Sequence, residues 1–188
     1  MSEIVWDRDY LDQSGEIYIR PMGYDDIDDI VRWRNSDEVK KFFIYRGEFT
    51  HDNQVAWLEN HVNTGEVAQM IICRKNTGSG STEDTSLGCV YIRDIDHKNQ
   101  KGEYGIFIGE SEARGCGVGT KAAGLMLRYG FEELGLHRIY LRALEGNDRA
   151  VRSYEKAGFV KEGFLRDDVV IDGEYVSVIW MAAVSPNA

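Results

Sequence analysis

The chain has 188 residues, 43% of them hydrophobic and 11% aromatic, which is enough for one domain with a sizeable core. Its 22 basic and 32 acidic residues give a formal charge of −10, which argues against a dedicated nucleic-acid-binding protein, because such a protein needs a basic surface. The sequence has no run of 18 apolar residues that would predict a membrane span, and its first residues lack the pattern of an export signal. We therefore expect a cytoplasmic protein.

The cysteines and histidines do not predict a metal site. Cys73, Cys89 and Cys116 are far from the C-x-x-C spacing of zinc or redox sites, and their apolar or glycine neighbours suit free thiols. The four histidines are scattered along the chain, and His51 and His61, ten residues apart, would not share a helix face. The sequence therefore predicts a reduced protein without a metal.

The first half of the chain predicts an opening strand, two helices and a hairpin of two strands. Apolar residues at helical spacing favour one helix, and Thr50 is placed to cap the second. A glycine-rich and serine-rich stretch over 76–85 predicts a loop between the hairpin strands. The expected strands are 16–22, 67–75 and 87–95, and the first helix is 25–35.

The second half predicts a long central helix between strands. Residues 118–134 are apolar around most of a helical circumference, which is typical of a buried helix. A short helix is expected from Asn147 or Asp148 to Gly158. Strands are expected at 103–108, 137–144, 159–166 and 174–183. No repeat or linker divides the chain, so we expect one domain over 1–188, with 1–15 as an N-terminal extension.

A glycine-rich loop from Arg114 to Gly119 joins a strand to the central helix. The first amides of a helix lack partners and lie at the positive end of its dipole, and glycines let a ligand approach them, so the loop suits a phosphate or pyrophosphate. A strained turn without a ligand is the alternative. The residues that follow, Thr120 and Lys121, fit neither the dinucleotide fingerprint nor the P-loop.

Two ordered motifs resemble the GNAT superfamily of N-acyltransferases. Arg114, Gly117 and Gly119 form the Arg-x-x-Gly-x-Gly pattern of its acetyl-coenzyme A pyrophosphate loop. One helix and one strand later, the segment 147–159 is similar to its second signature, an Asn, a short helix with a Tyr, and Gly-Phe. The resemblance covers 103–166 and implies an α/β fold with a mixed, mostly antiparallel sheet that splays open beside the loop, flanked by helices.

The opening of the chain resembles particular branches of the superfamily. The segments 19–22, 32–39 and 57–58 are similar to enzymes that acetylate ribosomal-protein N-termini and, more closely, to those that acetylate amino-sugar nucleotides. Spermidine acetyltransferases share parts of the same pattern. The resemblance thus implies acetyl-CoA as cosubstrate and a small-molecule or peptide amine as acceptor, and it is compatible with a homodimer.

The resemblance also implies which residues hold acetyl-CoA. The Arg114 side chain and the amides of the loop would bind the pyrophosphate, and the backbone of the preceding strand would pair with the pantetheine arm. Asn147 would bind a pantetheine amide or cap its helix. The full expected set is Ile106, Phe107, Ile108, Arg114, Gly115, Cys116, Gly117, Val118, Gly119, Thr120 and Asn147.

Two residues are expected to transfer protons. Tyr154 lies where the family often places the acid that protonates the departing thiolate, and the alternative is a Tyr packed on the core. Glu103 would accept the amine proton if burial raised its pKa, although an exposed Glu103 or a water chain to another carboxylate is equally compatible.

Arg32, Trp33 and Arg34 are the expected acceptor-binding residues. The two arginines would clamp a diphosphate, and Trp33 would stack on a base or a sugar if it is exposed. The alternatives are a buried Trp33 with solvated or paired arginines, and a polyamine site lined by carboxylates. A protein of another class, a non-catalytic acyl-CoA-binding module, would keep the loop but not the acid and base.

Overall fold

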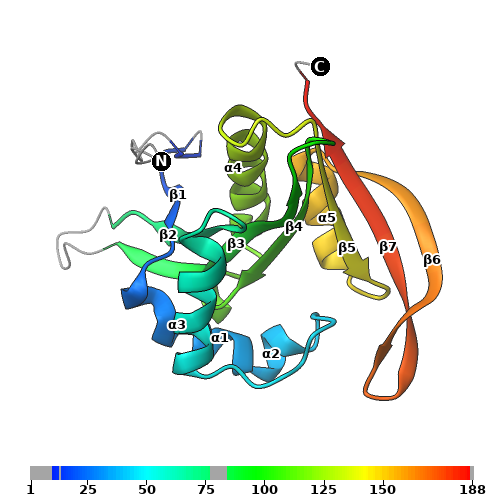
Figure 1. The fold of residues 1–188 in the computed structure, drawn as a ribbon, viewed down its shortest axis with the longest axis horizontal. Helices are drawn as coiled ribbons and strands as arrows, with labels where there is room; N and C mark the ends of the chain where they lie inside the picture. Colours follow the sequence, from blue (N-terminus) through cyan, green and yellow to red (C-terminus); the bar gives the residue numbers. More distant parts are fainter. Residues whose placement is uncertain (1–9, 13, 77–83, 187–188) are drawn as a thin grey trace.

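The computed structural model describes residues 10–12, 14–76 and 84–186. One seven-stranded sheet runs through them in the order β1-β2-β3-β4-β5-β7-β6 (Figure 1). All neighbouring strands are antiparallel except β4 and β5. The strands are β1 (Ile17–Pro21), β2 (Ala68–Arg74), β3 (Thr85–Asp96), β4 (Lys101–Ile108), β5 (Arg138–Leu144), β6 (Val160–Ile171) and β7 (Glu174–Val184).

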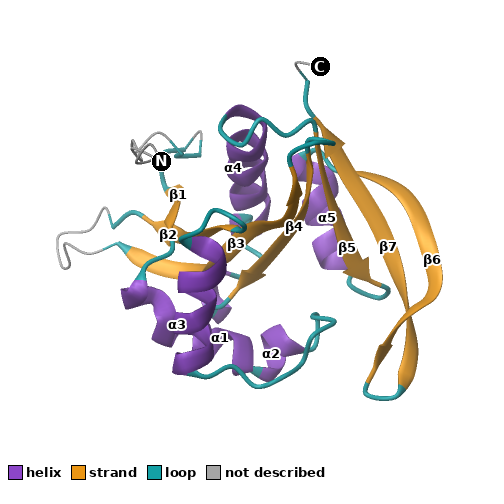
Figure 2. Ribbon diagram, viewed as in Figure 1, coloured by secondary structure: helices purple, strands orange, loops and turns teal. Residues whose placement is uncertain are grey.

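Helices cover both faces of this sheet (Figure 2). The α-helices are α1 (Ile27–Asn35), α2 (Asp37–Lys40), α3 (His51–Trp57), α4 (Val118–Glu132) and α5 (Asp148–Ala157), with shorter 3-10 turns η1 (Tyr24–Asp26) and η3 (Ser111–Ala113) and a π-helical turn η2 (Leu58–Val62). The expected mixed, mostly antiparallel sheet flanked by helices is thus confirmed. Thr50 caps α3 as expected, since its Oγ1 accepts a hydrogen bond from the Asn53 amide. The helix α2 was not predicted, and most of the loop expected over 76–85 lies outside the described residues.

The alternation of side chains along the strands gives the sheet two cores. On β3, Val90 and Ile92 lie in the larger core with Met126 of α4, whereas Cys89 before them and Tyr91 between them lie with Trp33 of α1 in the second core. Successive residues of a strand point to opposite faces, so a fully buried strand supplies both cores. The central helix α4 therefore covers one face, and α1 and α3 cover the other.

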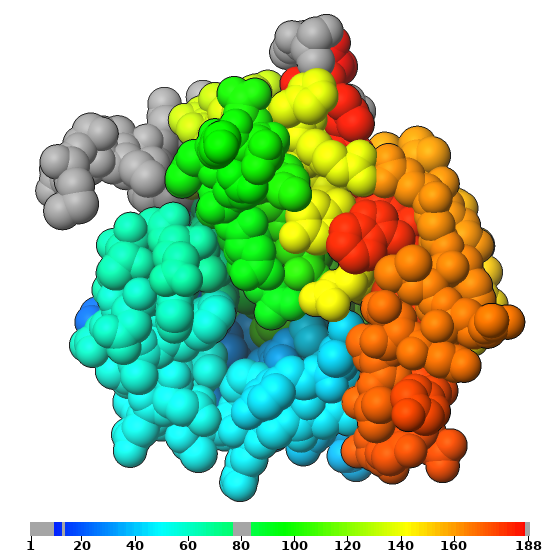
Figure 3. Space-filling view, turned by 45° about the vertical axis from the view of Figure 1, so that its right-hand side comes forward, coloured from blue at the N-terminus to red at the C-terminus, as the bar shows by residue number. Residues whose placement is uncertain are grey.

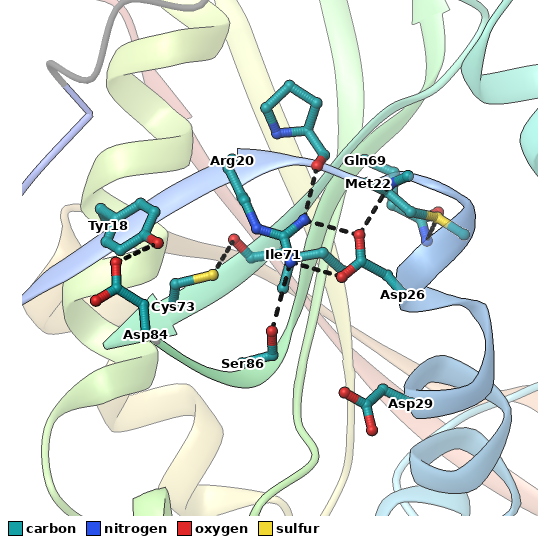
Figure 4. A network of polar contacts seen from close by, with 12 residues as sticks. Tyr18, Arg20, Met22, Asp26, Asp29, Gln69, Ile71, Cys73, Asp84 and Ser86 are labelled. Carbon is teal, nitrogen blue, oxygen red and sulfur yellow. Dashed lines mark hydrogen bonds and ion pairs between the residues drawn. The ribbon is translucent and has the colours of Figure 1, made fainter. Parts of the chain in front are cut away.

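A polar network fixes α1 to the first strand (Figure 4). Arg20 of β1 donates to both carboxylate oxygens of Asp26, at 2.7 and 2.6 Å, and the Gly23 amide donates to Asp26 Oδ2 at 2.8 Å. Asp26 is buried, and these bonds supply partners for its charge. They set the direction in which the chain leaves β1, and hence the position of α1 on the sheet.

The sheet opens between its two central strands. β4 and β5 pair only from Lys101–Arg138 to Glu103–Tyr140, after which β4 continues along β3 to Ile108 and β5 continues along β7 to Leu144. The residues 104–108 therefore have an edge whose backbone groups β5 does not use. This is the splay that the resemblance predicted.

The described part of the N-terminal extension packs on α4. The Tyr10 hydroxyl donates to Glu133 Oε1 at 2.9 Å, and its ring meets Tyr129 edge-on. Lys121 of α4 forms an ion pair with Asp12 at 2.7 Å. In the described ranges no helix has the length and hydropathy that would let it cross a bilayer.

Candidate active site

A cavity of about 690 Å³ lies at the splay. Its wall is built from α2, the unpaired end of β4, the glycine loop, the start of α4, and one face of α5. Figure 3 shows the face on which the light-blue segment that carries α2 borders a hollow below the green part of the chain. The cavity therefore joins the glycine loop to the gap between β4 and β5.

The glycine loop presents free backbone donors to this cavity. Gly115 and Gly117 have φ angles of +86° and +81°, in the left-handed region that favours glycine. Gly117 is the N-cap of α4 and has no side chain that could cap the helix, and the first turn of α4 holds no acidic residue. The helix end therefore keeps its partial positive charge and its unpaired amides for an anion.

The Arg114 side chain is engaged within the protein. Its Nε donates to the Ile108 carbonyl at 3.0 Å, one terminal nitrogen donates to the Gly109 carbonyl at 2.7 Å, and the other forms an ion pair with Glu38 of α2. Arg114 lines the cavity, but these bonds tie the loop to the end of β4 and to α2. A contact from its side chain to a phosphate would require an exchange with Glu38.

Three cations of α5 that the sequence analysis missed also line the cavity: Arg149, Arg152 and Lys156. Arg149 lies over the loop, since a Cβ on Gly115 would meet its terminal nitrogen at 2.8 Å. The sequence could have predicted that these three cations lie together, because positions 149, 152 and 156 share one face of a helix. In a chain with a charge of −10, this cationic side of the cavity is a local exception.

Most of the other expected cofactor residues border the same cavity. Ile106, Phe107 and Ile108 lie on the unpaired end of β4. Thr120 also lines it, and its hydroxyl is bonded to that of Ser153 at 2.8 Å. Asn147 is the N-cap of α5, but its side chain makes no capping hydrogen bond, so the amide is available to a ligand.

Tyr154 faces the cavity from α5. Its ring meets those of Tyr104 and Phe159 edge-on, with centroids 5.9 Å away in each case. Burial, with a smaller effect from the charge of Tyr91, raises the pKa of Tyr154 well above its usual value. The phenol therefore keeps its proton at neutral pH and can donate it.

Of the residues expected to bind the cofactor or to transfer protons, three do not line the cavity: Glu103, Cys116 and Val118. Glu103 is 7% exposed and accepts hydrogen bonds from two arginines, Arg142 at 3.0 and 3.2 Å and Arg93 at 3.3 Å. This cluster joins β3, β4 and β5 where the splay begins, which gives Glu103 a structural position. The Cys116 thiol contacts the Glu112 carbonyl at 3.4 Å, and the Val118 side chain is buried in the core.

The structure does not bring Arg32, Trp33 and Arg34 together into an acceptor site. Arg32 is exposed and paired with Asp29 and Glu110. Trp33 is 1% exposed, so it cannot stack on a ligand; its ring packs on Gly109 and its Nε1 donates to Glu110 at 2.8 Å. The guanidinium of Arg34 lies among phenylalanine rings. Successive residues of a helix point in different directions, and the expected diphosphate clamp therefore does not form.

Comparison with known proteins gives the same fold. The structure matches that of spermidine N-acetyltransferase from Vibrio cholerae in complex with CoA and spermine, with a TM-score of 0.79 and 24% identity over 90% of this chain and 95% of that chain. At this identity the match shows a shared fold and nothing further.

Curated relatives match over part of their length. Spermidine N(1)-acetyltransferase of Escherichia coli (strain K12) is 37% identical over 94 residues, which is 50% of this chain and 50% of the relative. The putative ribosomal N-acetyltransferase YdaF of Bacillus subtilis (strain 168) is 33% identical over 103 residues, 54% of this chain and 56% of the relative. The chain thus spans about half the length of these relatives.

A family comparison covers more of the chain. Residues 16–160, from the first strand to the start of β6, match the family described as "Acetyltransferase (GNAT) domain". This range contains the glycine loop, the splay and Tyr154, the parts from which the cavity is built. The chain belongs to the GNAT acetyltransferase family.

Proposed function

We propose that the chain transfers the acetyl group of acetyl-CoA to a primary amine. The observation that carries this proposal is the cavity at the splay, which connects the free amides of the glycine loop to Tyr154. Pyrophosphate suits the α4 N-terminus and the cations of α5, and the unpaired edge of β4 suits an extended amide-bearing arm. Acetyl-CoA supplies the activated thioester.

The proposed chemistry needs one proton donor from the protein. A neutral amine attacks the thioester carbonyl, the carbon–sulfur bond breaks, and the departing thiolate takes the Tyr154 proton. The proton that the acylated nitrogen loses passes to water, and the Tyr154 phenolate regains a proton from water. Because the pKa of Tyr154 is raised, this donor stays protonated from neutral to mildly alkaline pH. The structure does not support Glu103 as the base in the same way. Its oxygens already accept hydrogen bonds from Arg93 and Arg142, and it does not line the cavity.

The first experiment separates an enzyme from a non-catalytic acyl-CoA-binding module. Acetyl-CoA binding is measured by calorimetry, and CoA release is followed with a thiol reagent over spermidine, a ribosomal-protein N-terminal peptide, and a UDP-linked amino sugar. Release that depends on an amine is expected. Tight binding with no release on any amine would favour the binding module and contradict the proposal.

The second experiment tests Tyr154. Tyr154→Phe keeps the ring and removes the proton, so turnover should fall by about 10²–10⁴-fold while acetyl-CoA affinity changes little. Tyr140→Phe is the matched control, because Tyr140 stacks on Trp180 and does not line the cavity. Equal turnover of the two variants, where chemistry limits the rate, would assign Tyr154 to packing.

We also propose that residues 1–188 fold as one domain and that the protein forms a homodimer, a state with which the resemblance is compatible. Sedimentation velocity tests the second statement, and a single monomeric species at micromolar concentration would contradict it.

A further inference from the structure

Three exposed cations of α5 line the cavity: Arg149, Arg152 and Lys156. Within the part of the chain that the structure describes, none of them has an ion-pair or hydrogen-bond partner. Arg114, a further cation of the wall, is instead paired with Glu38. Like charges three or four residues apart on a helix repel one another. The grouping therefore destabilises α5 in the free protein, and an anion in the cavity would offset this effect.

The geometry of α5 places these cations on one flank of the helix and Tyr154 on the other. Ser153 points at the start of α4, because its hydroxyl is bonded to that of Thr120 at 2.8 Å. An α-helix turns by about 100° per residue, so Arg152 and Tyr154, the residues before and after Ser153, point to opposite sides of that contact. Arg149 and Lys156 share the flank of Arg152.

Coenzyme A carries its phosphates in two places. The pyrophosphate lies between the pantetheine arm and the adenosine, and a third phosphate is attached to the 3′-oxygen of the ribose. If the pyrophosphate lies on the glycine loop and the thioester lies at Tyr154, the arm runs along the Tyr154 flank of α5. The adenosine extends from the other end of the pyrophosphate, and the cationic flank of α5 is the charged wall of the cavity that the arm leaves free.

The three cations are too far apart for one pyrophosphate to engage them all. Arg149 lies beside the loop, since a Cβ on Gly115 would meet its terminal nitrogen at 2.8 Å. At a rise of about 1.5 Å per residue, Arg152 lies about 4.5 Å and Lys156 about 10 Å further along α5. A pyrophosphate beside Arg149 thus leaves Arg152 and Lys156 for a second anionic group.

We propose that Arg152 and Lys156 bind the 3′-phosphate of coenzyme A, so that the chain selects CoA over 3′-dephospho-CoA. The proposal rests on the proposed acetyltransferase function and adds a determinant of its cosubstrate specificity. Positions i and i+4 are neighbours on a helix, so both side chains can reach one phosphate. The arginine offers a fork of donors and the lysine a compact charge, and together they balance the nearly two negative charges of a phosphate monoester at neutral pH.

The first test measures binding without turnover. The affinities of the wild type for CoA and for 3′-dephospho-CoA are compared by calorimetry at low salt. We expect CoA to bind about tenfold or more tightly, because its additional phosphate accepts charge-assisted hydrogen bonds. The preference should narrow as salt is added, since the cations are exposed. Equal affinities at low salt would overturn the proposal, and this comparison needs no variant.

The second test assigns the preference to residues. In the double variant Arg152→Gln/Lys156→Gln the preference for CoA should fall to about twofold or less, while the affinity for 3′-dephospho-CoA changes little. The matched control is Lys161→Gln/Arg166→Gln, which removes the same two charges from β6, away from the cavity, and should keep the preference. A preference that survives in the α5 variant, or that is lost equally in the control, would contradict the assignment.

A third measurement uses turnover. With acetyl-dephospho-CoA in place of acetyl-CoA, the KM of the wild type should rise about tenfold or more and kcat should change little, because the 3′-phosphate lies far from the thioester. In Arg152→Gln/Lys156→Gln the two cosubstrates should have similar KM values. A fall in kcat with an unchanged KM would contradict a role in cofactor binding.

These measurements separate the two proposals. A preference for CoA that depends on Arg152 and Lys156, without CoA release on any amine, would remove the enzyme and keep the phosphate site. Acetylation of an amine by a protein that binds CoA and 3′-dephospho-CoA equally well would keep the enzyme and remove the site.

Discussion

Gly115 is the single residue of the glycine loop whose replacement the structure opposes in two ways. Its φ of +86° disfavours any side chain, and a Cβ would lie 2.8 Å from the Arg149 guanidinium. The loop thus depends on the absence of a side chain both for its conformation and for the position of a cation. Gly117 has the same left-handed conformation, but nothing lies within 4 Å of an added Cβ there. A substitution at Gly117 therefore changes the backbone conformation without a contact to a neighbouring side chain.

We expect Gly115→Ala to weaken acetyl-CoA binding by about tenfold or more in calorimetry, because it displaces both Arg149 and the loop amides. Gly135→Ala is the control: Gly135 has a φ of +62°, nothing lies within 4 Å of its added Cβ, and it does not line the cavity. Both variants should lose about 1–2 kcal/mol of stability from the strained backbone. Equal cofactor affinity in the two variants would show that the loop does not hold the ligand.

At the scale of elements, ion pairs fix how the first strand meets the helices. The pair of Arg20 and Asp26 joins β1 to α1 (Figure 4), and Lys121 of α4 holds Asp12 next to the start of β1. These pairs are worth more than the exposed pair of Arg32 and Asp29, because one partner in each is almost fully buried.

Asp26→Asn should lower the free energy of unfolding by about 2–3 kcal/mol, since it leaves a partly buried guanidinium without its anion. Asp29→Asn, one helical turn later, should cost less than about 1 kcal/mol, because both members of its pair are exposed. Urea unfolding of both variants tests the difference. A similar loss in the two would mean that the network of Figure 4 contributes no more than a surface pair.

The attachment of the N-terminal segment should depend on pH. Burial alone would raise the pKa of Asp12, but hydrogen bonds from Lys121, Ser14 and the amides of Ile17 and Glu16 outweigh it and hold the pKa well below its usual range. The group therefore stabilises the folded protein above the pKa of the unfolded chain, about 3.9, and this contribution is lost as the pH falls further. Asp12→Ala should cost about 1.5–3 kcal/mol at pH 7, and the gap to the wild type should narrow below about pH 4. A gap that stays constant with pH would contradict this.

At the scale of the whole molecule, the cations that line the cavity are opposite in sign to the net charge of the chain. The chain carries a formal charge of −10, yet the proposed ligand is a polyanion, so binding relies on the local cations of α5. Charges beyond about 10 Å are largely screened at moderate salt, whereas those that line the cavity act directly.

Arg152→Gln should therefore weaken acetyl-CoA binding by about three- to tenfold at low salt, and less at high salt. Arg166→Gln removes the same charge from the exposed strand β6, away from the cavity, and should leave the affinity unchanged. Equal effects of the two variants on the affinity would mean that net charge, rather than the face of α5, controls binding.

The sequence by itself determined the order and type of most elements, the family, and the glycine loop before the central helix. These depend on local signals: the period of apolar residues, the cap at Thr50, and glycines at fixed spacing before a helix. The sheet, the splay and the left-handed glycines of the loop agree with that prediction. The short helix α2 was not predicted, because four residues form too few turns to show a helical period of apolar residues.

Only the tertiary structure decided which side chains reach the cavity. Arg32, Trp33 and Arg34 are consecutive, yet one is paired at the surface, one is buried under Gly109 and one lies against phenylalanine rings. Glu103 and Arg114 have partners from distant parts of the chain, Arg142 and Glu38, and no local pattern indicates them. A side chain's role follows from its partners in space, and long-range partners are fixed only when the sheet and its two helical layers come together.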